Sequence, residues 1–267
     1  MKSSLILERV KDHLVDVRSN FYPDKDWFVI CLQGSQNYGL ADEESDVDTK
    51  MLLLPSMRDL ALNNKAVSKT CIRDNNEHID CKDTREYFKI FRKSNINFVE
   101  ILFTDYWIAN PLYQDLWLEL LSRREELARI NPYAAVNCMG GMAAEKWHAL
   151  THEYPSRMHM IEKYGVDPKQ LSHLIRIKYF IDAYIAGKPY MDCIQVEDGD
   201  KDYLLRVKRT CDGMSKEEAI ALGQKTYDYI HDKVQIFRQH NVNKENEELV
   251  EFINDILYRL ISRSLIK

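Results

Sequence analysis

Residues 28–55, FVICLQGSQNYGLADEESDVDTKMLLLP, constrain the fold more than any other part of the chain. An apolar run leads into a Gly-Ser pair. A stretch rich in turn-forming residues follows, and a D-x-D pair of carboxylates then opens a second apolar run. Short apolar runs bounded by turn residues are typical of buried β-strands. With the helical patterns on either side, the segment predicts an α/β domain.

Asp46 and Asp48 occupy positions whose side chains share one face of a strand, whereas Val47 between them points to the other face, into the core. Two carboxylates this close repel each other unless a positive charge lies between them. A divalent cation supplies that charge, and oxygen ligands of this kind favour Mg²⁺ or Mn²⁺. The pair therefore predicts a metal site.

Gly34 and Ser35 directly follow the first predicted strand. A glycine at this place lets backbone N–H groups approach an anion closely, and a serine adds a hydroxyl donor. Taken singly, a Gly-Ser pair and a D-x-D pair each indicate no more than a turn. In combination they predict a phosphate-binding turn that faces a metal site, which suits a metal-bound nucleoside triphosphate.

This arrangement resembles the DNA polymerase β-type nucleotidyltransferase superfamily, and its fuller form, G-S-x-x-Y-G-L-x-x-x-x-S-D-V-D, is similar to the YcgL-like predicted nucleotidyltransferases. The resemblance implies Asp46 and Asp48 as catalytic metal ligands, with a nucleotide held by the Gly-Ser pair and Tyr38. It also implies transfer of a nucleoside monophosphate with release of pyrophosphate. The matching residues are Gly34, Ser35, Tyr38, Gly39, Leu40, Ser45, Asp46, Val47 and Asp48.

The same resemblance implies a third catalytic carboxylate on a later strand, close to the first two. Asp80 is the favoured candidate because its neighbours, Ile79 and Cys81, are apolar and would face the core. Asp83 is the alternative, although its sequence context favours an N-cap of the next helix. Glu100 lies in an N-x-x-x-x-E-x-L-F segment that the family shares. Its role is either structural or near the site, and the sequence does not decide between the two.

An apolar helix predicted around residues 169–180 carries His173 and Arg176 on one face, with Lys178 nearby. A helix that is apolar on most sides lies centrally, so its polar side chains need partners. One interpretation pairs them with buried carboxylates. The other places this helix opposite the D-x-D pair across a cleft, where His173, Arg176 and Lys178 bind phosphates of the nucleotide or substrate.

Length and pattern predict two domains in the 267 residues, a nucleotidyltransferase domain over 1–112 and an all-helical domain over 113–267. The net charge of −5 argues against a dominant nucleic-acid surface. No apolar run reaches membrane-spanning length. Six scattered cysteines without a C-x-x-C pair, and no export signal, predict reduced thiols in a cytoplasmic protein with no membrane partner. The outer apolar stripe of the last helix is compatible with a homodimer interface.

The acceptor stays open among an RNA end such as a tRNA 3′ terminus, a small molecule, and a protein hydroxyl. The acidic balance and the carboxylates Asp42, Glu43 and Glu44 beside the motif favour the last two. A non-catalytic nucleotide-binding regulatory module is the alternative function. Retention of three candidate acids argues against that alternative.

Overall fold

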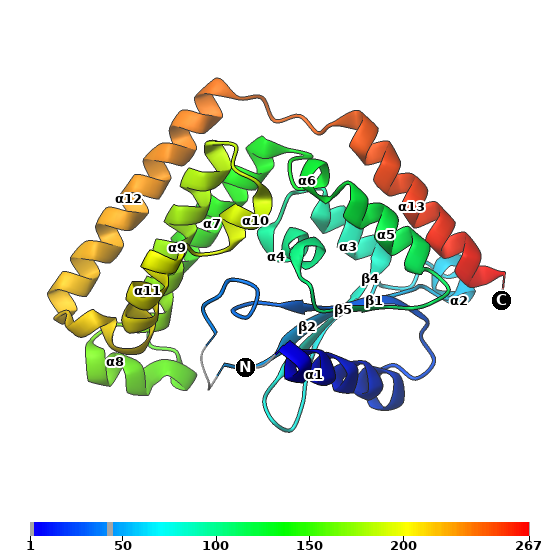
Figure 1. Ribbon diagram of the computed structural model, residues 1–267, viewed down its shortest axis with the longest axis horizontal. Coiled ribbons are helices and arrows are strands. Elements are labelled where there is room, and N and C mark those ends of the chain that lie inside the picture. The colour runs from blue at the N-terminus through cyan, green and yellow to red at the C-terminus, as the bar shows by residue number, and fades with distance from the viewer. Residues whose placement is uncertain (1–2, 42–44, 267) are drawn as a thin grey trace. The chain divides into compact units, whose positions relative to one another are not determined.

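The computed structural model describes residues 3–41 and 45–266 and shows a mixed α/β protein (Figure 1). Its contacts divide the chain into two compact units. Unit 1 comprises Met1–Asn131 together with Glu245–Lys267, and unit 2 comprises Pro132–Lys244.

Unit 1 is built on a five-stranded sheet of order β3-β4-β2-β1-β5. β2 and β4 run parallel, and the other neighbouring strands are antiparallel. The two strands predicted from the apolar runs of residues 28–55, and the later strand predicted to carry Asp80, are therefore confirmed as β1, β2 and β4. The strand bounds are β1 Trp27–Gln33, β2 Asp48–Leu53, β3 Ser68–Ile72, β4 His78–Asp83 and β5 Trp107–Ala109.

The sheet is covered on both faces. α1, Ser3–Asp16, packs on one face and contributes Ile6 and Val10 to a core with alternate residues of the strands. Helices α3, α4 and α5 lie on the other face (Figure 1), where Phe28 of β1 meets Trp117 of α5 edge to face at 5.8 Å between ring centroids. Burial on both sides explains why β1 and the second half of β2 read as continuous apolar runs, whereas β3 is mostly exposed and β4 alternates between polar and apolar residues.

The remaining elements of unit 1 are helical. They are the π-helical turn η1 Val17–Phe21, α2 Met57–Ala61, α3 Thr84–Phe91, α4 Ile96–Val99, the 3₁₀ turn η2 Glu100–Phe103, α5 Gln114–Ser122, α6 Arg124–Leu127 and α13 Glu247–Leu265.

All the regular secondary-structure elements of unit 2 are helices, joined by loops. Its elements are α7 Pro132–Ala149, η3 Pro155–Arg157, α8 Met158–Tyr164, α9 Pro168–Ile185, α10 Tyr190–Ile194, α11 Asp198–Thr210, η4 Cys211–Gly213 and α12 Lys216–His240.

The two compact units differ from the two domains expected from the sequence, which met at residue 112, because unit 1 extends to Asn131 and also includes Glu245–Lys267. The last helix, α13, belongs to unit 1 because ion pairs tie it to α5 and to the end of α3. The pairs are Arg259 with Glu119, Arg263 with Asp115, and Arg92 with Glu245. A sequence pattern that is helical after residue 112 cannot show that its last helix returns to the first unit.

Of the helices within residues 3–41 and 45–266, none combines the length and the apolar character needed to span a membrane.

Candidate functional site

The two strands that carry the candidate acids lie side by side. β2 and β4 are parallel, with Lys50 opposite Asp80. Side chains alternate between the faces of a strand, so Asp48 and Lys50 share a face of the sheet with His78 and Asp80. The backbone N–H of His78 donates to Asp48 Oδ1 at 2.9 Å, which fixes one carboxylate oxygen. The structure thus places Asp48 and Asp80 on one face, as predicted.

In the D-x-D segment the middle side chain is buried and the two acids reach solvent, as predicted. Val47 is fully buried in the core beneath α1, whereas Asp46 is exposed and the Asp48 side chain is 36% exposed. A valine anchored between two solvent-accessible acids holds the segment without covering them. Both carboxylates therefore remain available to a ligand.

The Gly-Ser turn lies beside these acids. β1 and β2 are antiparallel with Gln33 opposite Asp48, so the turn that follows Gln33 starts next to the D-x-D segment. Gly34 has a φ of +87°, which favours glycine, and a Cβ built there would meet no atom of the described residues within 4 Å. Backbone therefore borders open space at Gly34, next to the candidate metal ligands. The carbonyl oxygen of Ser35 accepts the N–H of Leu40 at 3.1 Å and closes the turn.

Asp80 has cationic partners that the sequence reasoning missed. Lys50 Nζ donates to Asp80 Oδ2 at 2.5 Å, and Lys82 Nζ lies 3.2 Å from Oδ1. Lys50 is only 2% exposed and lies over the Phe98 ring, 4.4 Å from its centroid. A lysine two residues after Asp48 shares its face of the strand, and this spacing is the one sequence signal that could have placed a cation near the acids.

Asp83 is the N-cap of α3, as its sequence context predicted. It is buried and accepts the backbone N–H of Arg85 at 2.9 Å. Its two oxygens also bind the Arg85 guanidinium, at 3.0 and 2.7 Å. Both oxygens of Asp83 are thus occupied by Arg85, and Asp83 lies on the opposite face of β4 from Asp80, which shares the face of Asp48.

Asp46 and Asp48 are two accessible carboxylates, the ligand type that hard divalent cations prefer. Among residues 3–41 and 45–266 there is no group of three or more His, Cys, Asp or Glu side chains arranged to hold a metal ion. This agrees with the two lysines at Asp80. Asp46 and Asp48 remain as hard oxygen ligands, and Mg²⁺ is commonly bound by one or two carboxylates together with substrate phosphates. Asp42, Glu43 and Glu44 lie outside the described residues.

Tyr38, predicted to contact the nucleotide, is buried, and its hydroxyl donates to the buried carboxylate of Glu100. This contact gives Glu100 a structural partner. It ties the turn after the Gly-Ser pair to η2, where Glu100 opens the 3₁₀ turn. Tyr38 therefore supports the shape of the turn from inside unit 1.

Replacing Tyr38 with phenylalanine is expected to lower the free energy of unfolding by about 1–3 kcal/mol, because a buried carboxylate loses a donor. Urea unfolding measures the loss. Tyr258→Phe, at a side chain that is 72% exposed on α13, is the matched control and should stay within about 0.5 kcal/mol of wild type. Equal effects of the two changes would contradict the role given to the Tyr38 hydroxyl.

A buried polar network supports the D-x-D segment from behind the sheet. Glu77, fully buried, accepts the backbone N–H of Val47 at 2.9 Å through Oε1. Its Oε2 lies 3.0 Å from His13 Nε2 and accepts from Asn75 and Arg73 at 2.8 and 3.2 Å, and Arg9 forms a further ion pair. Burial alone would raise the pKa of Glu77, but these hydrogen bonds outweigh it and lower the pKa to about 2. The carboxylate therefore stays ionised and holds Val47 in place.

His13 of α1 connects this network to β2. Its Nδ1 lies 2.8 Å from Thr49 Oγ1, and its Nε2 faces Glu77. Burial lowers the pKa of His13 and outweighs the opposing effect of Glu77, so the ring is neutral at pH 7. A neutral ring with its proton on Nε2 donates to Glu77 and accepts from Thr49, which satisfies both nitrogens.

His13 is expected to make the protein less stable at acidic pH. Its pKa is depressed in the folded state, so the unfolded chain binds more protons once the pH falls below about 6.5, and stability is lost as the pH falls. The loss between pH 7 and 5 reaches at most about 2 kcal/mol. His13→Gln should weaken the pH dependence of the urea midpoint. His173, whose pKa is also lowered, contributes equally to both proteins. An unchanged dependence would contradict the prediction.

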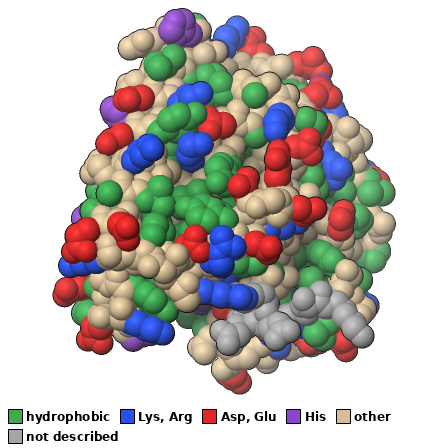
Figure 2. Space-filling view, turned by 60° about the vertical axis from the view of Figure 1, so that its left-hand side comes forward, with side chains coloured by type: hydrophobic (Ala, Val, Ile, Leu, Met, Phe, Trp, Pro, Cys, Tyr) green, Lys and Arg blue, Asp and Glu red, His purple; other side chains and the backbone are tan. Residues whose placement is uncertain are grey.

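In unit 2, α9 places His173 and Arg176 one turn apart, as predicted. Burial lowers the pKa of His173 well below 6.5, and the charges of Arg176, Lys169, Lys146 and Lys208 lower it further. These cations come from α7, α9 and α11, and together with His173 they are called the basic cluster. Within it Arg176 is buried and Lys146 forms an ion pair with Glu145 at 2.7 Å. On the face of the molecule shown in Figure 2, Lys and Arg side chains are interspersed with Asp and Glu side chains.

Lys178, two residues further along α9, has different surroundings. Its Nζ lies 3.2 Å from Asp182 and 4.7 Å from the centroid of the Tyr229 ring. The structure therefore brings His173 and Arg176 into the basic cluster and leaves Lys178 outside it.

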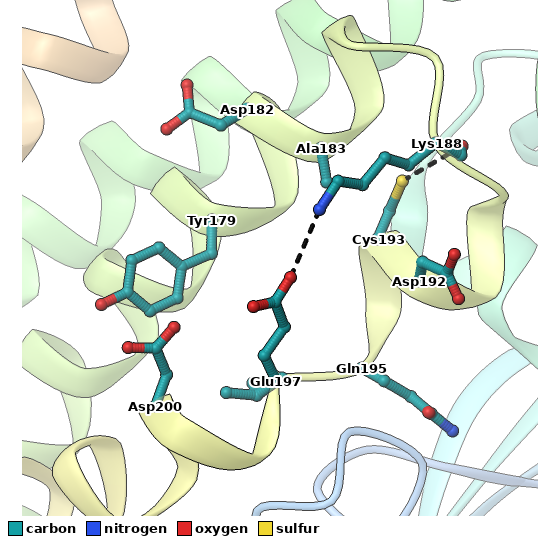
Figure 3. Close-up of a pocket in the computed structure, with 10 residues that line it drawn as sticks. Tyr179, Asp182, Ala183, Lys188, Asp192, Cys193, Gln195, Glu197 and Asp200 are labelled. Atoms are coloured by element: carbon teal, nitrogen blue, oxygen red, sulfur yellow. Dashed lines mark hydrogen bonds and ion pairs between the residues drawn. The ribbon is translucent and has the colours of Figure 1, made fainter.

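A cavity of about 260 Å³ in unit 2 has the opposite charge (Figure 3). Lys188 reaches toward Glu197 across it, with 3.3 Å between nitrogen and oxygen. Three more carboxylates, those of Asp182, Asp192 and Asp200, also line this cavity. An acidic lining repels phosphates, so this cavity does not suit a nucleotide.

Comparison of the sequence with models of known protein families and with curated proteins gives no match.

Proposed function

We propose that this protein is a metal-dependent nucleotidyltransferase, which moves a nucleoside monophosphate from a nucleoside triphosphate to an acceptor hydroxyl or phosphate and releases pyrophosphate. One observation carries the proposal. The antiparallel pairing of Gln33 with Asp48 sets the Gly34–Ser35 turn directly beside the D-x-D carboxylates. Phosphate-binding backbone and metal-binding oxygens are thereby available to one ligand.

In this proposal Asp46 and Asp48 hold Mg²⁺ or Mn²⁺, which when bound neutralises phosphate charge and activates the acceptor oxygen. The N–H of His78 keeps Asp48 oriented. Gly34 and Ser35 bind the β- and γ-phosphates through backbone N–H groups and the serine hydroxyl. The rate gain comes mainly from positioning and from charge neutralisation. Asp80 lies on the same face of the sheet as Asp48, and its ion pair with Lys50 holds it in place.

The basic cluster of unit 2 is assigned to phosphate binding in the same proposal. Its support is the positive charge that Arg176, Lys169, Lys146 and Lys208 together exert on His173. A neutral histidine among cations can donate a hydrogen bond to a phosphate without adding charge. Lys178 has no part in this assignment, because it pairs with Asp182.

A non-catalytic nucleotide-binding module is the second candidate, and one observation favours it. Asp80, the candidate third acid, is paired with Lys50 and approached by Lys82. A site in which the third carboxylate is neutralised from within would bind a nucleotide and its metal, but would transfer slowly.

Incubation with each α-³²P-labelled nucleoside triphosphate and Mg²⁺ or Mn²⁺ tests both candidates. The acceptors offered are total tRNA, total protein and an aminoglycoside. Label in one pool supports the transferase and identifies the acceptor class. Binding of labelled nucleotide without transfer supports the regulatory module. If the protein binds no nucleotide in the presence of either metal, both are wrong.

A further inference from the structure

Lys50 is a fixed positive charge inside the candidate metal site. It is 2% exposed, and its ammonium lies between the Asp80 carboxylate and the Phe98 ring. A buried ammonium cannot move into solvent without giving up both contacts. Removing it from Asp80 would also leave that carboxylate, which is 14% exposed, with Lys82 as its one ion-pair partner among the described residues.

The charges around the sheet face limit what else can bind there. Asp80 Oδ2 is occupied by Lys50 at 2.5 Å, and its Oδ1 lies 3.2 Å from Lys82. A divalent cation at Asp80 would approach both ammonium groups, and like charges a few ångströms apart repel strongly in a partly buried site. Asp46 is exposed, and the contacts of Asp48 are with His78 alone among the described partners: its backbone N–H at 2.9 Å and its Nδ1 at 3.4 Å, both at Oδ1, which leaves Asp48 Oδ2 without an ammonium beside it.

We infer that the site binds a single divalent cation, at Asp46 and Asp48, and that Lys50 occupies the place of a second. The inference rests on the proposed function and deepens it, because it sets the metal content of the nucleotide complex. Lys50 is a positioning residue here: it fixes Asp80 and excludes a cation from it.

Equilibrium dialysis with ⁵⁴Mn²⁺ and a tritiated α,β-methylene nucleoside triphosphate measures this directly. The ratio of bound manganese to bound nucleotide in the full-length protein is expected to be one. A ratio of two would overturn the inference and leave the proposed function standing. If neither ligand is retained, the proposed function fails and the inference fails with it.

Three variants assign the effect to Lys50. Lys50→Met removes the ammonium and is expected to raise the ratio from one to two, since Asp80 becomes a metal ligand. Lys50→Met combined with Asp80→Asn removes both charges of the pair and should return the ratio to one. Lys69→Met, at an exposed lysine on β3, should leave the ratio at one.

The double variant keeps the test decisive if the single variant unfolds, because a neutral pair leaves no uncompensated buried charge. A ratio of one in a folded Lys50→Met protein would overturn the role given to Lys50. A ratio of two in the double variant would equally overturn it, because the second cation would then not depend on Asp80.

Discussion

Asp48→Asn is expected to lower nucleotidyl transfer by at least about a thousandfold, or about 4 kcal/mol of transition-state stabilisation, while the fold stays intact. Asparagine keeps the size of the side chain and the acceptor for the His78 N–H, but it removes the negative charge that binds a cation. Asp46→Asn should have a similar effect. The measurement is incorporation of α-³²P label into the acceptor, with circular dichroism to check the fold.

The matched control is Asp74→Asn, in the exposed turn between β3 and β4. Like the other two changes, it removes one negative charge from unit 1, but it does so outside the D-x-D segment. Transfer should therefore stay within about twofold of wild type. Undiminished transfer in Asp46→Asn or Asp48→Asn, or an equal loss in Asp74→Asn, would contradict the assignment of the metal ligands.

Glu77→Ala is expected to lower the free energy of unfolding by about 3–5 kcal/mol. The change leaves the arginines Arg9 and Arg73 without their buried carboxylate and leaves the Val47 N–H without its acceptor. Urea unfolding followed by tryptophan fluorescence suits the measurement, because Trp27, Trp107 and Trp117 all lie in unit 1.

Two controls separate the causes of this loss. Glu77→Gln keeps an oxygen for the Val47 N–H and removes only the charge, so it should lose less than Glu77→Ala. Glu8→Ala, at an exposed position on α1, should change stability by no more than about 0.5 kcal/mol. A Glu77→Ala protein as stable as the Glu8→Ala protein would show that the network does not support the D-x-D segment.

The strands and the face of the acids followed from local pattern. The pattern predicted Val47 in the core between two accessible acids, and Val47 is buried, Asp46 is exposed just before β2, and Asp48 opens β2. The N-cap at Asp83 was equally local. Each of these features depends on neighbours in the sequence, which is why the sequence predicted them.

The ion pair of Lys50 with Asp80 depends on a parallel register between strands 30 residues apart, and local pattern does not determine that register. The contacts of Glu77 with α1 and with Val47 have the same origin. The return of α13 to unit 1 is also set by long-range packing. The sequence therefore predicted the acids but not the cations and the buried carboxylate that hold them.

The most direct test of the account compares α- and γ-³²P-labelled nucleoside triphosphate in parallel reactions with Mn²⁺. A nucleotidyltransferase places the α label in the acceptor and the γ label in pyrophosphate, and Asp46→Asn and Asp48→Asn abolish both products. Appearance of the γ label in the acceptor, or α-label transfer that persists in these two variants, would contradict the account.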